Sequence, residues 1–159
     1  MTFNNLLQMI IAALFLIVFT FCTWYEGSEI MDRPWEWKYS TYFTQVDDDQ
    51  AMDAGDISNF DHFVYAAKFK PLFPFLMVLT ASYLIILTGY ILFKRSIKKV
   101  ALFLFGLGVL FLLSTGFVSN SPTVGGNIFQ AFFLIGGMIA IIGAALYYFR
   151  MLTGLHTEI

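Results

Sequence analysis

The chain has 159 residues, of which 58% are hydrophobic and 13% are charged, and its mean hydropathy is +0.73. Soluble domains are less apolar and roughly 25% charged, so this composition indicates a chain that lies largely in lipid. The net charge is -2, and the basic cluster at 94–99 is smaller than the basic face that nucleic-acid binding requires, which excludes nucleic acid as a partner. With Cys22 as the single cysteine, an intrachain disulfide and a CxxC metal or redox motif are excluded.

Four apolar runs contain no Asp, Glu, Lys, Arg or His; they cover about 6–23, 72–93, 100–118 and 128–149. At about 1.5 Å per residue, roughly 20 residues cross a hydrocarbon core of about 30 Å. We therefore predict an all-α membrane protein, a single domain over residues 1–159 with a bundle of four transmembrane helices. The first run lacks the basic start and small-residue cleavage site of a signal peptide, so we expect it to remain as a span.

The segment between the first two spans, residues 24–70, is too long for a simple connection and holds ten of the eleven acidic residues. In it, Trp35, Trp37 and Tyr39 alternate with polar residues, which is typical of a half-buried strand. Residues 24–30 could pair with this strand through a turn near Pro34. We predict a small extracytoplasmic loop domain made of a short β-hairpin and an amphipathic helix.

The acidic stretch 46–56 raises the question of a calcium site. An EF-hand loop starting at Asp47 would require an oxygen ligand at Ala51 and glycine at Met52, so the pattern fails. A solvated acidic surface is the favoured interpretation, and an irregular weak cation site stays open. We expect no metal site and no cofactor.

The amphipathic helix is expected to begin at a capping box formed by Ser58 and Asp61 and to run to Lys70. Its apolar residues recur at helical spacing: Ile57, Phe60, Phe63, Val64 and Ala67. We expect this helix to lie on the outer membrane surface or under the strands. His62 falls on the side opposite Phe60 and Val64, and we expect it to be a solvated surface residue.

The basic turn "KRSIKK", residues 94–99, sets the expected orientation, because short cytoplasmic loops are enriched in Lys and Arg. Arg150 after the fourth run agrees with it. We therefore predict a multi-pass plasma-membrane protein with both termini in the cytoplasm and residues 24–70 and 119–127 outside.

Small residues repeat at intervals of four in the last span, at Gly136, Ala140 and Ala144. Such a stripe lets helix backbones approach closely in lipid. We favour helix packing within one chain, and a homo-oligomer stays open.

Two blocks after the first span are distinctive: Trp24-Tyr25-Glu26-Gly27-Ser28 and Pro34-Trp35-Glu36-Trp37-Lys38-Tyr39-Ser40. In these blocks the chain resembles the YjdJ-like family of small membrane proteins from Bacillus-type bacteria. The resemblance implies a bacterial plasma-membrane protein and supplies no activity. The layout is also similar to that of claudins, in topology only, because the loop lacks their Gly-Leu-Trp run and their cysteine pair.

An aromatic surface of this kind suits protein recognition, because Trp, Tyr and Arg are favoured in the cores of interfaces. The candidate partner-binding residues are Trp24, Tyr25, Trp35, Trp37, Tyr39 and Tyr42. The alternative is that the rings anchor the loop at the level of the lipid headgroups. We expect a non-enzymatic accessory or interaction protein, with an immunity, regulatory or complex-subunit role and a membrane or extracytoplasmic protein as partner.

Two other classes of function are less favoured. An oligomeric channel or small transporter usually carries ionisable residues within its spans, and these spans have none. An enzyme could use an acid/base pair among the loop carboxylates, of which Glu26, Glu29, Asp32 and Glu36 are candidates. No histidine or cysteine is arranged beside them, so we expect no catalytic residues.

Overall fold

The computed structural model describes residues 3–44 and 54–156. Within these ranges, four helices are long and apolar enough to cross a membrane: α1 (Phe3–Gly27), α4 (Leu72–Phe93), α5 (Ile97–Val118) and α6 (Val124–His156). The predicted all-α, multi-pass membrane protein with four spans is confirmed. The connection between α1 and α4 folds as short helices: η1 (Ser28–Asp32), η2 (Pro34–Glu36), α2 (Trp37–Ser40), η3 (Ala54–Asp56) and α3 (Asn59–Phe69).

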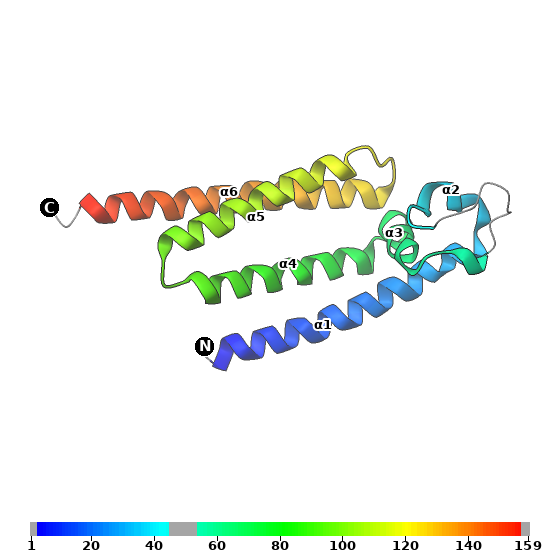
Figure 1. Cartoon of the computed structure of the whole chain (residues 1–159), viewed down its shortest axis with the longest axis horizontal. Helices are drawn as coiled ribbons and strands as arrows, with labels where there is room; N and C mark the ends of the chain where they lie inside the picture. Colours follow the sequence, from blue (N-terminus) through cyan, green and yellow to red (C-terminus); the bar gives the residue numbers. More distant parts are fainter. Residues whose placement is uncertain (1–2, 45–53, 157–159) are drawn as a thin grey trace.

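These short elements gather at one end of the bundle (Figure 1). We call this end the cap and define it as residues 24–44 and 54–70. The start of α1, the 94–99 turn and the end of α6 lie together at the opposite end (Figure 1). The cap is therefore separated from the basic turn by the full length of the spans, and which side of the membrane it faces remains a prediction.

The spans are arranged as two antiparallel pairs, α1 with α4 and α5 with α6, whereas α4 and α5 touch only over a short stretch. In the second pair, a Cβ atom on Gly108 would lie 3.0 Å from the Gly137 carbonyl oxygen, and one on Gly137 would lie 3.1 Å from the Gly108 carbonyl oxygen. Small residues thus let the two backbones approach closely. Gly136 packs on the Phe111 ring and Ala144 is buried, while the nearest backbone approach is at Gly137.

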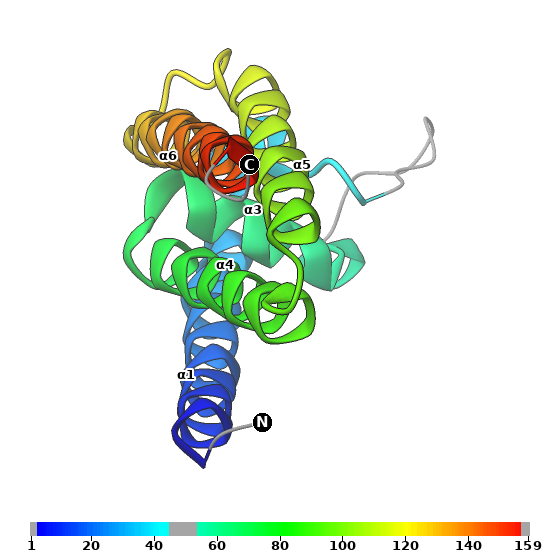
Figure 2. The same ribbon diagram turned by 90° about the vertical axis from the view of Figure 1, so that its left-hand side faces the viewer.

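Helix α3 runs across the cap end of the bundle, between α4 and α6 (Figure 2). Two glycines, one in α1 and one in α6, pack directly against its backbone. A Cβ atom on Gly27 of α1 would lie 2.0 Å from the His62 carbonyl oxygen, and one on Gly125 of α6 would lie 1.8 Å from the Ala67 carbonyl oxygen. Because both contacts are with backbone, α3 joins the two helical pairs at distances that only glycine allows.

The predicted β-hairpin is wrong, because no strand occurs in the described part of residues 24–70. Helix α1 continues to Gly27, and Pro34 opens a helical turn at a position where its missing N–H costs little. Helical turns satisfy the backbone locally, with Glu36 N bonded to Arg33 O at 3.0 Å and Thr41 N to Trp37 O at 3.0 Å. Two isolated strands would have left one set of these groups unpaired at each edge.

The predicted helix before α4 is confirmed as α3, but its buried face is different from the one expected. Ser58 caps the N-terminus of the helix by accepting from Phe60 N at 3.3 Å. The Asp61 carboxylate does not complete a capping box and instead accepts hydrogen bonds from residues 42–44. Phe60 is 66% exposed, and His62, predicted to be a solvated surface residue, is fully buried. The reason is that α3 packs against α1 at Gly27 instead of lying alone on the membrane surface.

The acidic stretch expected at 46–56 falls mainly on residues 45–53, which lie outside the described ranges. The hypothesis of a weak cation site in that stretch is therefore not addressed by the structure.

The glycine contact at α3 gives a first prediction. Replacing Gly27 with alanine places a methyl group against the His62 carbonyl, and we expect a loss of stability of about 1–3 kcal/mol from overpacking. Thermal unfolding of the detergent-solubilised protein measures it. The matched control is Gly106→Ala, because a Cβ atom there meets nothing within 4 Å. Equal melting temperatures for the two variants would contradict the close contact of Gly27 with the backbone of α3.

Candidate functional site in the cap

A network of charged side chains connects the elements of the cap. Glu29 is paired with both Arg33 and Lys70, and the Nη1 atom of Arg33 also lies 3.5 Å from Oε1 of Glu36. The buried Tyr65 hydroxyl donates to Oε2 of Glu36 at 2.7 Å. The hydrogen bond from Lys70 lowers the pKa of Glu29, while burial and the Glu36 carboxylate raise the pKa of Tyr65. These contacts tie η1, η2 and α3 together.

Asp61 organises the segment that follows α2. Its carboxylate is fully buried and accepts hydrogen bonds from Tyr42 N at 2.8 Å, Phe43 N at 3.0 Å and the Thr44 hydroxyl at 2.5 Å. The Thr44 hydroxyl oxygen in turn accepts from Ser58 N at 3.0 Å. The backbone of residues 42–44 is thus fixed to the start of α3. No sequence pattern predicts this role of Asp61, because its partners are 17 to 19 residues away in the chain.

Two of the three tryptophans help to build the cap. The Trp37 ring packs against the buried cluster of Ile30, Ile57 and Tyr65, and its indole N–H donates to Ile30 O at 2.7 Å. Trp24 donates to the Asn59 side-chain oxygen at 3.3 Å, and its ring centre lies 5.9 Å from that of His62. Both indole N–H groups therefore donate hydrogen bonds within the cap.

The other expected partner-binding residues present their rings outward. The exposed fractions are 75% for Tyr25, 68% for Trp35, 57% for Tyr39 and 67% for Tyr42. Phe43 and Phe60, which the sequence analysis did not single out as contact residues, are also exposed and lie 5.7 Å apart between ring centres. A sequence signal existed for Phe43, because it directly follows Tyr42 in the aromatic stretch.

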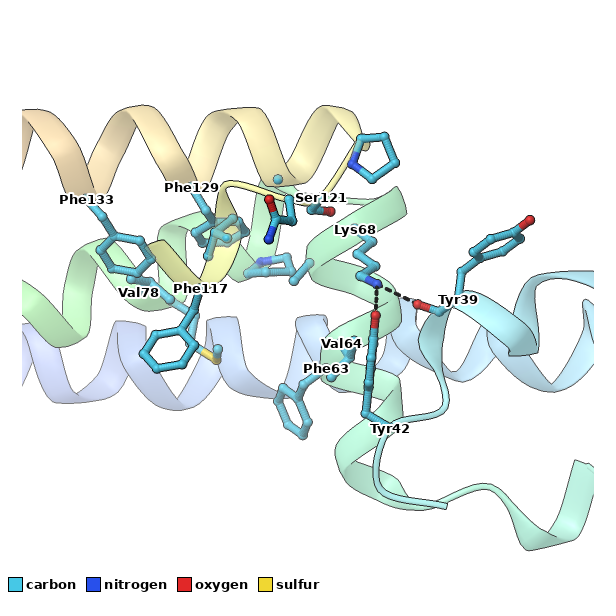
Figure 3. A pocket seen from close by; sticks show the side chains of 17 residues that line it. Tyr39, Tyr42, Phe63, Val64, Lys68, Val78, Phe117, Ser121, Phe129 and Phe133 are labelled. Atoms are coloured by element: carbon cyan, nitrogen blue, oxygen red, sulfur yellow. Dashed lines mark hydrogen bonds between the residues drawn. The ribbon is translucent and has the colours of Figure 1, made fainter. Parts of the chain in front are cut away.

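A groove with a volume of about 580 Å³ lies between the cap and the spans (Figure 3). Its apolar walls come from α3, α4, α5 and α6, and Tyr39 and Tyr42 form its rim on the cap side. At this rim the Lys68 ammonium donates to Tyr39 O at 2.5 Å and to the Tyr42 hydroxyl at 2.8 Å, and it lies 4.5 Å from the centre of the Tyr42 ring (Figure 3).

Three side chains at the α1–α3 contact carry buried polar atoms without a hydrogen-bond partner in the described part of the chain. They are Thr23 (Oγ1), Glu26 (Oε2) and His62 (both ring nitrogens). Burial lowers the pKa of His62, against a smaller raising effect of the neighbouring Asp61 carboxylate. The imidazole is therefore neutral at neutral pH. Across the described ranges, no three His, Cys, Asp or Glu side chains come together in a way that could hold a metal ion.

Comparison with known proteins gives one family. The model of the family described as a domain of unknown function, DUF4306, matches residues 6–93, which contain α1, the cap and α4. The chain is also similar to the uncharacterized protein YjdJ of Bacillus subtilis (strain 168), with 31% identity over 77 residues that cover 47% of this chain and 69% of that protein. No solved structure matches the chain. The chain belongs to the DUF4306 family, and the resemblance to YjdJ-like proteins is confirmed.

The Asp61 contacts predict that this carboxylate is required for an ordered cap. Asp61→Ala leaves two backbone N–H groups and the Thr44 hydroxyl without their acceptor, and we expect a loss of stability on the order of 3 kcal/mol. Hydrogen exchange should show the Tyr42 and Phe43 amides losing protection. Asp32→Ala, at an exposed carboxylate of η1, serves as control and should leave these amides protected. Unchanged protection in Asp61→Ala would disprove the role of Asp61.

The burial of His62 predicts a dependence of stability on pH. Because its pKa in the folded state lies below the ordinary value of 6.5, the unfolded chain binds a proton at pH values where the folded chain does not. Its contribution is therefore complete above pH 6.5 and is lost as the pH falls through the lowered pKa. We expect thermal unfolding of the wild-type protein to shift to lower temperature on acidification, and this shift should shrink in His62→Gln. An equal shift in both proteins would contradict the prediction.

Proposed function

We propose that this member of the DUF4306 family is a non-enzymatic accessory protein of the plasma membrane that recognises a protein partner through exposed aromatic side chains of its cap. The observation that carries the proposal is that Trp35, Tyr39 and Tyr42 are exposed on a backbone that hydrogen bonds hold in place. Trp and Tyr dominate the energetics of protein interfaces, which favours this surface as the contact.

The rigidity of the cap supports the proposal. Ordering of loops and side chains on binding reduces affinity. Here the Asp61 carboxylate fixes the backbone at Tyr42, and the Lys68 ammonium holds both the Tyr39 carbonyl and the Tyr42 hydroxyl. These two tyrosines are thus preorganised, and a partner would meet them with little loss of conformational entropy.

The six proposed contact residues divide by their environment. Trp37 and Trp24 hold the cap together through Ile30 O and Asn59, so we assign them a supporting role. Tyr25, Trp35, Tyr39 and Tyr42 present free ring surface and form the proposed contact set. The partner would be a membrane or extracytoplasmic protein, with the chain acting as an immunity factor, a regulator or a complex subunit.

The orientation of the protein is part of the proposal. Lys94, Arg95, Lys98 and Lys99 lie at the end of the bundle opposite the cap. The enrichment of Lys and Arg in short cytoplasmic loops favours this end as the cytoplasmic one, with both termini inside and the cap outside.

The state of the cap carboxylates supports a non-enzymatic role. Of the candidate acid/base residues, Glu29 is engaged by Arg33 and Lys70, and Glu36 by Arg33 and the Tyr65 hydroxyl. A lowered pKa keeps Glu29 ionised, which opposes the raised pKa that a general acid requires. The alternative of an oligomeric channel or small transporter has no comparable observation in its favour.

Co-purification after crosslinking in native membranes tests the proposal. We expect the amount of co-purified partner to fall at least tenfold in the double variant Trp35→Ala/Tyr39→Ala. Both rings are exposed, and neither belongs to the buried cluster of the cap. The matched control is Tyr148→Ala, an aromatic residue of similar exposure (52%) near the far end of α6. Expression and melting temperature should be unchanged in both variants.

Two outcomes would overturn this function. Full partner recovery with the double variant, at an unchanged melting temperature, would remove the aromatic surface from recognition. If brominated lipids quench the fluorescence of Trp35 equally with and without the partner, the rings instead anchor the cap at the headgroup level.

A further inference from the structure

The groove beneath the cap lies where the two helical pairs separate. Pro74, Met77 and Val78 from α4 line one side of it, and Phe117 of α5 with Phe129 and Phe133 of α6 line the other. Phe63 and Val64 of α3 form its wall on the cap side (Figure 3). Its volume of about 580 Å³ is in the range of about 300–1,000 Å³ that is usual for small-molecule sites.

With the four helices spanning a bilayer, the groove would lie at the boundary between headgroups and acyl chains. Its apolar residues belong to the first turns of α4, the last turn of α5 and the second and third turns of α6. These are the ends of spans, so in a bilayer these residues would lie near the edge of the hydrocarbon region. Lys68 and Ser121 lie outside the spans, before α4 and between α5 and α6. An occupant would therefore meet apolar walls at one end and polar groups at the other.

At the polar end of the groove, no described carboxylate pairs with Lys68. Lys68 contacts two neutral oxygens, the Tyr39 carbonyl and the Tyr42 hydroxyl, and no carboxylate among the residues that the structure describes. Lys70, two residues further on, is paired with Glu29. An ammonium group has three donors, so one N–H of Lys68 remains for an anion. The Tyr42 hydroxyl accepts from Lys68 and keeps its own proton to donate.

We propose that this groove binds an anionic glycerophospholipid, with its phosphate at the Lys68 ammonium and the Tyr42 hydroxyl and one acyl chain between Val78, Phe117 and Phe133. A phosphate supplies the missing acceptor for both donors. A hydrocarbon chain suits the walls better than a peptide segment does, because a peptide would bring backbone groups that the phenylalanine side chains cannot satisfy. The site does not depend on recognition of a protein partner.

Native mass spectrometry of the full chain in detergent, with phosphatidylglycerol and phosphatidylcholine added in turn, tests the site. We expect the wild-type protein to retain phosphatidylglycerol at least tenfold better than phosphatidylcholine. Lys68→Gln should abolish this preference, and Lys68→Arg should restore it. Lys99→Gln is the control, because it removes the same charge at the opposite end of the bundle, and it should leave the preference intact.

The acyl chain is tested separately from the headgroup. Val78→Trp fills the apolar part of the groove, and we expect it to reduce retention of both lipids at least fivefold while the melting temperature stays near that of the wild type. Equal retention of the two lipids by the wild-type protein, or full phosphatidylglycerol retention by Lys68→Gln, would overturn the proposal. A dimer without bound lipid, lost in Val78→Trp, would show that a second copy of the chain occupies the groove instead.

Discussion

The contact of α3 with two glycines is the constraint on which the cap depends. Between charge-free helices in lipid, there is no hydrophobic driving force for association, and close van der Waals packing takes its place. Gly27 and Gly125 bring the backbones of α1 and α6 onto opposite ends of α3. Because α4 and α5 touch only over a short stretch, α3 connects the two helical pairs at this end, together with the ring contacts of Phe75 in α4 with Phe129 and Phe132 in α6. The groove forms beneath α3 because the pairs diverge there.

The family model matches the first helical pair and the cap, and its range ends before the second helical pair begins. Residues 6–93 contain α1, the cap and α4, so the Gly27 contact, the Asp61 hydrogen bonds and the ion pairs of Glu29 all fall within the matched range. Helices α5 and α6, with Gly125 and the Phe129 wall of the groove, lie outside it. The cap thus lies wholly within the matched range, whereas the groove also requires α5 and α6, which lie outside it.

The sequence was sufficient for the spans, because a run of about 20 residues without charge has few alternatives to crossing a bilayer. It placed the end of the first span at 23, whereas α1 continues to Gly27. Hydropathy detects where lipid ends, and the last turn of α1 is helical because it packs on α3. The hairpin was wrong because three aromatic residues at spacing two are too few to distinguish a strand from helical turns, and Pro34 starts a helix as readily as it ends a strand.

The polar contacts of the cap could not be predicted for a different reason. Asp61 bonds to residues 42–44 and Tyr65 to Glu36, and these pairings depend on how α3 lies across the bundle. The position of His62 opposite Phe60 was read correctly from helical spacing, but the side that becomes buried is decided by Gly27. Local sequence specified the helix and its Ser58 cap, whereas its orientation comes from contacts distant in the chain.

Tyr42 links the two surfaces of the cap. Its backbone N–H is bound by Asp61, its hydroxyl by Lys68, and its ring is exposed. A side chain fixed at both ends has little rotamer freedom left to lose, which suits a contact residue. The same Lys68 bond places the Tyr42 hydroxyl at the rim of the groove, so an anion bound there would accept a hydrogen bond from this hydroxyl and add a further contact to the ring. The exposed aromatic surface and the groove are therefore physically coupled at one residue, although different side chains, Trp35 and Val78, allow each to be tested alone.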